Sequence, residues 1–154
     1  MGANMARRLN GMGYPVTSAC DFETNGARKL AAEVGAEACT NIARLTELSG
    51  VITAVVTDDK AHLHIFTHKK DNVLMGAKGR VFVNCATITP GVHVQVEKLA
   101  GKAKAGSREG CVAGANSRVL VTDGEDMMNR DHPCFFDAAH RNASRSFMNT
   151  NNHD

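Results

Sequence analysis

The chain has 154 residues, of which 43% are hydrophobic and 22% are charged, and its formal net charge at pH 7 is +2. This length suits a single domain that buries one core. So small a charge excludes the strongly basic surface that binds nucleic acid or anionic membranes, and no apolar run is long enough to cross a bilayer. We therefore expect neither nucleic acid nor a membrane as a partner and, because no secretory leader is recognisable, a cytoplasmic protein.

The cysteines are odd in number and widely spaced, and none form a Cys-x-x-Cys pair. They are Cys20, Cys39, Cys85, Cys111 and Cys134. Several lie in apolar runs, where cysteine behaves as a small hydrophobic residue. The pattern predicts reduced thiols rather than a disulfide framework.

The first predicted elements are a helix and a short strand. Small residues after Gly2, together with the apolar Met5 and Leu9, are typical of the first turns of a helix. Val16–Cys20 predicts a short strand that ends just before Asp21.

Two helices and a buried strand are predicted next. The segment GARKLAAEVG has apolar residues at helical spacing and ends at Gly35, a usual helix terminator. Residues 41–48 predict a short helix capped by Thr40 or Asn41. Val51–Val56 is a continuous apolar run rich in β-branched residues, which is typical of a parallel strand covered on both faces.

The same alternation continues along the chain. Residues 60–76 predict a partly helical segment, and Arg80–Asn84 predicts another strand. Thr89 and Pro90 are suited to be the cap and the first residue of a following helix.

The last part of the chain has weaker patterns. EGCVAG and RVLVT predict two short strands, at 109–114 and 118–122, and residues 125–141 predict a helix. The tail 142–154 is polar and without periodicity, so we predict that it is disordered. Residues 1–141 are then one domain.

Strands that alternate with helices predict an α/β fold with a mostly parallel sheet and flanking helices. Right-handed crossovers place the loops that follow each strand along one edge of such a sheet, and ligands bind at that edge. The residues directly after the predicted strands are therefore the candidates for a functional site.

Two of these candidates fit a nucleotide. Gly2 at a helix start allows close approach of a pyrophosphate to free N–H groups. Asp21, after a strand, can accept both ribose hydroxyls of an adenosine and would repel a 2′-phosphate. Asp21 is equally well explained as a surface residue that caps the helix starting near Thr24 or Asn25.

Five segments occur in an order that resembles the β-hydroxyacid dehydrogenases, the relatives of 3-hydroxyisobutyrate dehydrogenase and tartronate semialdehyde reductase. They are MGANMARRLNGMGYPV with the CD that follows, VITAVVTDD, NCATITP, EGCVAGA and NRDHPCFFDAAHRN. The resemblance implies a Rossmann-like dinucleotide-binding domain over residues 1–141. It also implies that the first strand of the family's sheet is missing and that the sequence is truncated at both ends.

The resemblance also assigns residues to a cofactor and a substrate. It implies contacts with NAD or NADP from Gly2, Met5, Asp21, Thr57, Asp58 and Thr87. Phe22 follows Asp21 where relatives that prefer NADP often have arginine, so NAD is favoured. The substrate loop corresponds to Ala113, Gly114 and Ala115, for a hydroxy acid or its semialdehyde.

The family's catalytic lysine has no counterpart, because the last lysine is Lys104. We therefore assign no catalytic residue. Two hypotheses remain: a dehydrogenase domain impaired as an isolated chain, or a non-catalytic dinucleotide-binding module. Without the first strand, the strands at Val16 and Val51 would have open hydrogen-bonding edges, which predicts marginal stability or self-association.

A metal site is the weaker interpretation of HLHIFTH, although His64 and His68 have the i, i+4 spacing of a metal-binding pair. The segment has no glutamate between them, unlike the zinc proteases. We expect no bound metal.

Overall fold

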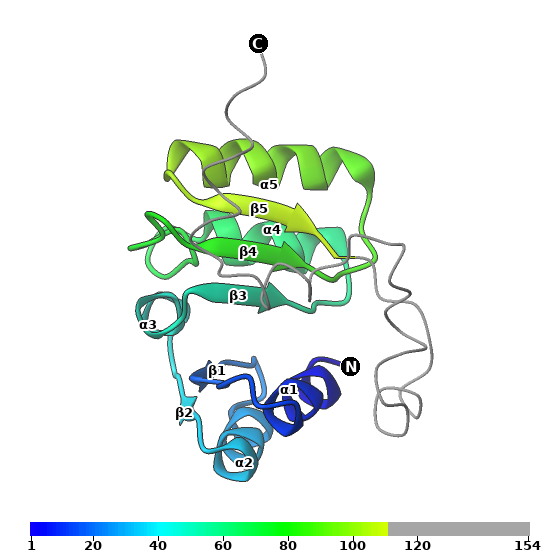
Figure 1. The fold of residues 1–154 in the computed structure, drawn as a ribbon. Helices are drawn as coiled ribbons and strands as arrows, with labels where there is room; N and C mark the ends of the chain where they lie inside the picture. The colour runs from blue at the N-terminus through cyan, green and yellow to red at the C-terminus, as the bar shows by residue number, and fades with distance from the viewer. Residues whose placement is uncertain (111–154) are drawn as a thin grey trace. The chain divides into compact units, whose positions relative to one another are not determined.

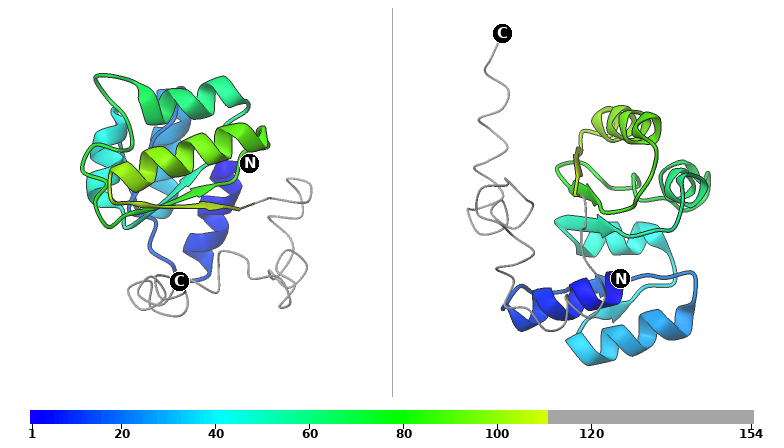
Figure 2. Two further views of the ribbon diagram at one scale, coloured as in Figure 1. Left: turned by 90° about the horizontal axis from the view of Figure 1, so that it is seen from above. Right: turned by 90° about the vertical axis from the view of Figure 1, so that its right-hand side faces the viewer.

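The computed structural model describes residues 1–110, which belong to a compact unit, Met1–Val112 (Figures 1 and 2). Helices and strands alternate along it. The first half contains α1 (Gly2–Gly11), β1 (Ser18–Ala19), α2 (Thr24–Val34), β2 (Glu37–Ala38) and α3 (Ile42–Leu48). The second half contains β3 (Val51–Ala54), α4 (Asp59–Thr67), β4 (Val81–Asn84), α5 (Pro90–Lys102) and β5 (Gly106–Glu109).

Local sequence signals mark the end of α2 and the start of α3, as predicted. Gly35 closes α2 in the left-handed conformation, with φ at 72°, which glycine adopts at little cost. Asn41, rather than Thr40, caps α3, because its Oδ1 accepts the N–H of Arg44 at 2.8 Å. A second cap comes from Asp71, whose carboxylate accepts the N–H groups of Ile42 and Ala43, both at 2.8 Å.

Every strand pair is parallel, which confirms the α/β class. β3, β4 and β5 form one sheet in that order, and Ile52 lies opposite Phe82 in the register. β1 and β2 form a separate pair, with Ser18 opposite Glu37. The expected single sheet is therefore two sheets among the described residues, because no strand pairs with both β1 and β3.

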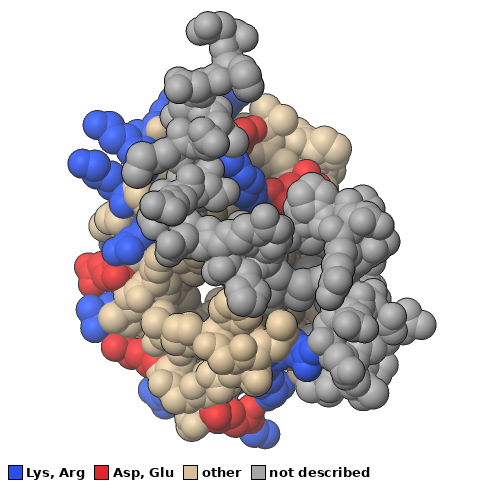
Figure 3. All heavy atoms as spheres, viewed as in Figure 1, with Lys and Arg blue, Asp and Glu red and all other residues tan. Residues whose placement is uncertain are grey.

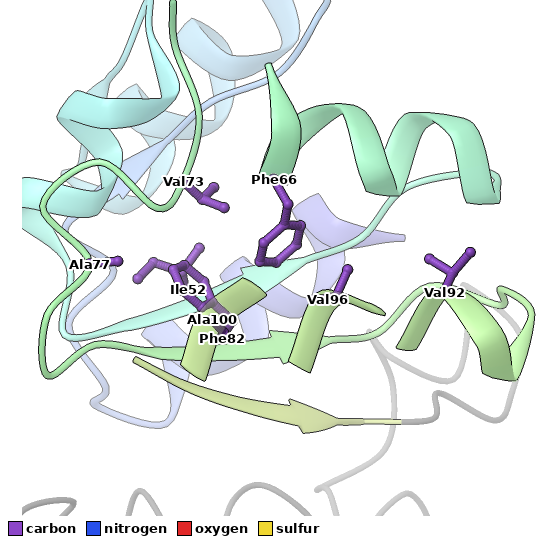
Figure 4. Packing of buried hydrophobic residues seen from close by; sticks show 8 residues of the cluster. All are labelled: Ile52, Phe66, Val73, Ala77, Phe82, Val92, Val96 and Ala100. Atoms are coloured by element: carbon purple, nitrogen blue, oxygen red, sulfur yellow. The ribbon is translucent and has the colours of Figure 1, made fainter. Parts of the chain in front are cut away.

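The main core lies between one face of the three-stranded sheet and the helices α4 and α5. Figure 4 shows the side chains that meet there: Ile52, Phe66, Val73, Ala77, Phe82, Val92, Val96 and Ala100. The rings of Phe66 and Phe82 meet edge to face with centroids 5.3 Å apart. Alternation along the strands places Ile52 and Phe82 on the covered face.

Some predicted strand boundaries were wrong. β1 covers only Ser18–Ala19 of the predicted Val16–Cys20, and β3 ends at Ala54 instead of Val56. The segment 60–76 is partly helical as predicted, since α4 ends at Thr67. The strand expected at 109–114 is β5, which begins at Gly106 in a polar segment without the strand signature. The predicted elements at 118–122 and 125–141, and the domain end and tail at 141–154, lie outside the described residues.

One strand was not predicted. β2 has two residues and pairs with β1 through the N–H of Glu37, which donates to Thr17 O, and the N–H of Cys39, which donates to Ala19 O. Two residues are too few to show a strand pattern in the sequence. β2 is ordered by its pairing with β1.

Charged groups of both signs are mixed over the surface. Figure 3 shows acidic side chains between basic ones on the face in view. No helix within residues 1–110 is long and apolar enough to cross a lipid bilayer.

Candidate functional site

The carboxyl ends of the parallel strands gather most of the predicted cofactor residues. The loops after β3, β4 and β5 leave the same edge of the three-stranded sheet, because these strands are parallel and in register. The start of α1 also lies there, since a Cβ built on Gly2 would be 3.4 Å from the Cβ of Val55, which follows β3. This edge is where α/β folds bind their ligands.

At the start of α1, the backbone N–H groups of Gly2 and Ala3 have no hydrogen bond within residues 1–110. Met1 is the N-cap residue and supplies no side-chain cap, and the first turn contains no acidic residue. Helix N-termini of this kind favour anions. Met5, by contrast, is the buried residue of α1, so its side chain packs inside the fold.

Asp21 lies after β1 and is exposed. Its Oδ1 accepts the N–H of Glu23 at 2.9 Å, which fixes the turn into α2, but Glu23 rather than Asp21 is the N-cap. Oδ2 has no hydrogen bond within the described part of the chain. Phe22 beside it is fully exposed, with a relative accessibility of 105%.

Thr57 and Asp58 form the loop between β3 and α4. Asp58 caps α4, because its Oδ1 accepts the N–H of Ala61 at 2.8 Å, while its Oδ2 accepts the hydroxyl of Thr57 at 3.1 Å. The hydrogen bond from Ala61 is the main cause that holds the pKa of Asp58 below its usual value. Asp58 therefore has a structural role that the sequence analysis did not assign.

Thr87 is exposed in the loop between β4 and α5, and its hydroxyl makes no hydrogen bond within residues 1–110. The loop ends at Thr89, which was predicted to cap α5. Thr89 is the N-cap residue, but its hydroxyl makes no cap bond, because it donates to Asp59 Oδ2 at 2.8 Å. The N–H of Thr89 donates to Asp59 Oδ1, also at 2.8 Å.

Gly110 follows β5 and was not singled out in the sequence. Its N–H donates to Asn84 O at 3.0 Å, which continues the ladder with β4 by one residue. A Cβ there would lie 2.8 Å from Val83 Cγ1 and 3.2 Å from Cys85 Sγ. The predicted substrate residues Ala113, Gly114 and Ala115 come shortly afterwards and lie outside the described residues.

A buried polar cluster lies beneath this edge and was also missed. His62 of α4 is fully buried, and among residues 1–110 neither ring nitrogen meets the geometry of a hydrogen bond. Asn84 donates from Nδ2 to Ser107 Oγ at 2.9 Å, while its buried Oδ1 has no hydrogen bond of good geometry within the same residues. The ring centroid of His93 lies 6.2 Å from that of His62, and His93 Nε2 lies 3.5 Å from Glu109 Oε1.

Burial lowers the pKa of His62, and the neighbouring His93 lowers it further. The side chain of Asn84 acts in the opposite direction, as does Asp59, with smaller effect than burial. His62 is therefore neutral in the folded protein near pH 7. Nothing in the segment HLHIFTH marks His62 as the histidine that is buried.

No three His, Cys, Asp or Glu side chains within residues 1–110 are placed to share a metal ion. The rings of His64 and His68 have centroids 4.9 Å apart, but His68 Nδ1 lies 3.1 Å from Asp71 O, so His68 takes part in the turn after α4. Burial raises the pKa of the Cys20 and Cys39 thiols, which keeps both protonated.

Comparison with known proteins identifies the family of the chain. Residues 1–124 match the family model of the NAD-binding domain of 6-phosphogluconate dehydrogenase. No curated protein matches the chain significantly.

Solved structures share the fold. 3-Hydroxyisobutyrate dehydrogenase of Mycobacterium tuberculosis, with L-serine, is 21% identical, with a TM-score of 0.68 over 78% of this chain and 40% of that one. Imine reductase of Myxococcus stipitatus, in complex with NADP+, is 18% identical, with a TM-score of 0.65 over 77% of this chain and 39% of that one. The V8 variant of this imine reductase, in complex with NAD+, is also 18% identical, with a TM-score of 0.66 over 77% of this chain and 39% of that one. The chain thus spans about two fifths of the length of these proteins.

Proposed function

Because the chain belongs to the family of the NAD-binding domain of 6-phosphogluconate dehydrogenase, we propose that it binds a nicotinamide dinucleotide, NAD in preference to NADP, along the carboxyl ends of its strands. The observation that carries this proposal is Asp21. Its carboxylate stands exposed at the end of β1, with one oxygen engaged by the turn and the other oxygen available. An anion in this place accepts ribose hydroxyls and repels a 2′-phosphate.

The remaining predicted residues suit the other parts of the cofactor. Gly2 and the free N–H groups of α1 would face the pyrophosphate, whose charge the helix dipole favours. Thr57 and Thr87, both exposed after neighbouring strands, would contact the nicotinamide half. Asp58 would support this half by holding Thr57, whose hydroxyl donates to its Oδ2, and by capping α4 through Oδ1.

We propose further that the chain is a nucleotide-binding domain of a dehydrogenase of the β-hydroxyacid type. When bound, the nicotinamide supplies the hydride acceptor or donor for a 3-hydroxy acid or its semialdehyde. Backbone N–H groups of Ala113, Gly114 and Ala115 would hold the substrate carboxylate. This part of the proposal rests on the sequence resemblance.

A non-catalytic dinucleotide-binding module is the second candidate, and the place of Lys104 favours it. Hydride transfer of this kind needs a general acid or base to exchange the substrate's hydroxyl proton. Lys104 lies in the turn between α5 and β5, at the amino end of β5 and so at the edge opposite the site. It cannot serve the nicotinamide edge from there.

Calorimetric titration of the 154-residue chain with NAD and NADP tests the proposal. We expect binding of NAD, weaker binding of NADP, and a loss of NAD affinity of about tenfold in Asp21→Ala, because charge-assisted hydrogen bonds to the ribose are removed. A folded chain that binds neither nucleotide would overturn the proposal. NADH formation with 3-hydroxyisobutyrate would favour the enzyme, and NAD binding without turnover would favour the module.

A further inference from the structure

The loops after β3 and β4 are tied to each other at both of their ends. At the strand ends, the N–H of Cys85 donates to Ala54 O at 2.9 Å. At the helix starts, the N–H and the hydroxyl of Thr89 donate to the two carboxylate oxygens of Asp59, each at 2.8 Å. Thr57 and Thr87 lie between the two ties.

The contact between Asp59 and Thr89 at the helix starts uses both oxygens of the Asp59 carboxylate. Both oxygens of Asp59 accept from one residue. A neutral amide could accept only one of these two donors, because its NH2 group can only donate, and the remaining bond would lose its charge. The negative charge of Asp59 also lies in the first turn of α4 and next to the N-cap of α5, where both helix dipoles favour it. The side chain of Thr89 is committed to this contact instead of capping its own helix.

We infer that Asp59 is a positioning residue for nucleotide binding: it holds the 85–89 loop in the shape that presents Thr87 to the nicotinamide half of the cofactor. This inference rests on the proposed function. Asp59 need not touch the nucleotide, since both of its oxygens are already engaged. Without this contact, the loop would keep its bond at Cys85 and the packing of Ala86 and Ile88, but its end at Thr89 would lose both bonds to Asp59, and binding would have to order that end.

The effect should be confined to one half of the dinucleotide. Asp21 and Gly2, which would hold the adenosine and the pyrophosphate, lie at the end of β1 and the start of α1. Neither element carries a partner of the Asp59 carboxylate. ADP, which lacks the nicotinamide and its ribose, is therefore a probe that Asp59 should not influence.

The experiment compares the dissociation constants of NAD and ADP in the 154-residue chain and its variants. Asp59→Asn should weaken NAD binding about five- to tenfold, because one charged hydrogen bond and the rigidity of the loop are lost, and should change ADP binding by less than about twofold. Thr89→Ser keeps both donors and should bind NAD like the wild type. Equal losses for NAD and ADP in Asp59→Asn, or no loss for either, would overturn the inference.

Thr89→Val provides a second route if Asp59→Asn does not fold. It removes only the hydroxyl and keeps the N–H bond to Asp59, and it should weaken NAD binding selectively, by a smaller factor than Asp59→Asn. Unselective weakening or no effect in this variant would overturn the inference. A folded wild type that binds neither NAD nor ADP would overturn the proposed function, whereas a wild type that binds both without the selective losses would overturn the positioning role alone.

Discussion

Gly110 lies so close to β4 that a Cβ at this position would be 2.8 Å from Val83 Cγ1. Val83 is 1% exposed and cannot move aside without disturbing the sheet. Gly110→Ala should therefore lower the free energy of unfolding by about 1–3 kcal/mol, the usual cost of overpacking.

The matched control for this prediction is Gly101→Ala in α5, where a Cβ meets no atom within 4 Å. It should be neutral or stabilise by up to about 1 kcal/mol, because alanine has the higher helix propensity. Urea denaturation of both variants measures the difference. Equal stability of the two variants would contradict the packing at the end of β5.

Removing the Asp71 carboxylate should destabilise the start of α3. Asp71→Ala leaves the N–H groups of Ile42 and Ala43 without their acceptor, and we expect a loss of about 1–2 kcal/mol. Asn41→Ala removes one cap bond instead of two and should cost less. The midpoints of denaturant unfolding measure which variant loses more stability. A smaller loss for Asp71→Ala than for Asn41→Ala would refute this prediction.

The stability of the folded chain should decrease in weak acid because of His62. Burial lowers the pKa of His62 in the folded state, whereas in the unfolded chain it stays near 6.5. As the pH falls through this value, the unfolded chain takes up a proton that the folded chain does not. Stability contributed by neutral His62 is thus present above about pH 6.5 and is lost as the pH falls toward the folded-state pKa.

The variant His62→Phe isolates this effect. It should flatten the dependence of unfolding free energy on pH below about pH 6.5, since the titrating group is gone. It also removes two buried nitrogens that form no hydrogen bond of good geometry within residues 1–110, so it should not destabilise the protein strongly at pH 7. An unchanged slope would show that His62 is not the group responsible.

Cofactor preference should respond to the residue after Asp21. Phe22 is fully exposed, so Phe22→Arg should leave stability unchanged while adding a cation that can bind a 2′-phosphate. We expect the ratio of NADP to NAD affinity to rise about tenfold, an electrostatic gain of roughly 1.4 kcal/mol. Phe22→Ala controls for loss of the ring. A ratio that rises equally in both variants would argue against the charge effect.

Open strand edges lead us to propose self-association of the isolated chain. β1 and β3 each pair on one side among the described strands, and Val51 at the start of β3 is 39% exposed. Val51→Lys should shift the chain toward monomer, because lysine on an edge opposes pairing. Val94→Lys, at a valine 49% exposed on α5, should not. Sedimentation velocity over a range of concentrations tests this, and a monomeric wild type throughout would refute it.

Most helices and the two apolar strands could be predicted because their signals are local. Gly35 terminates α2 through its own backbone conformation, and Asn41 caps α3 through a residue three positions away. β3 and β4 follow from short runs of apolar residues that must be buried. The strand β2 could not be found in this way, and the start of β5 was placed too late in the sequence, since their pairing partners and not their own residues order them.

The candidate site was likewise predictable only in part. Alternation of strands and helices was enough to indicate an α/β fold, and Gly2 and Asp21 suggested a nucleotide. Thr57 and Thr87 were assigned to the cofactor only through the family resemblance. Only the tertiary structure revealed that Asp59 binds Thr89, that Gly110 packs on Val83 and that His62 is buried. These relationships join residues about 30 positions apart on different elements, and a hydrogen bond or a contact over that separation exists only once the strands are in register.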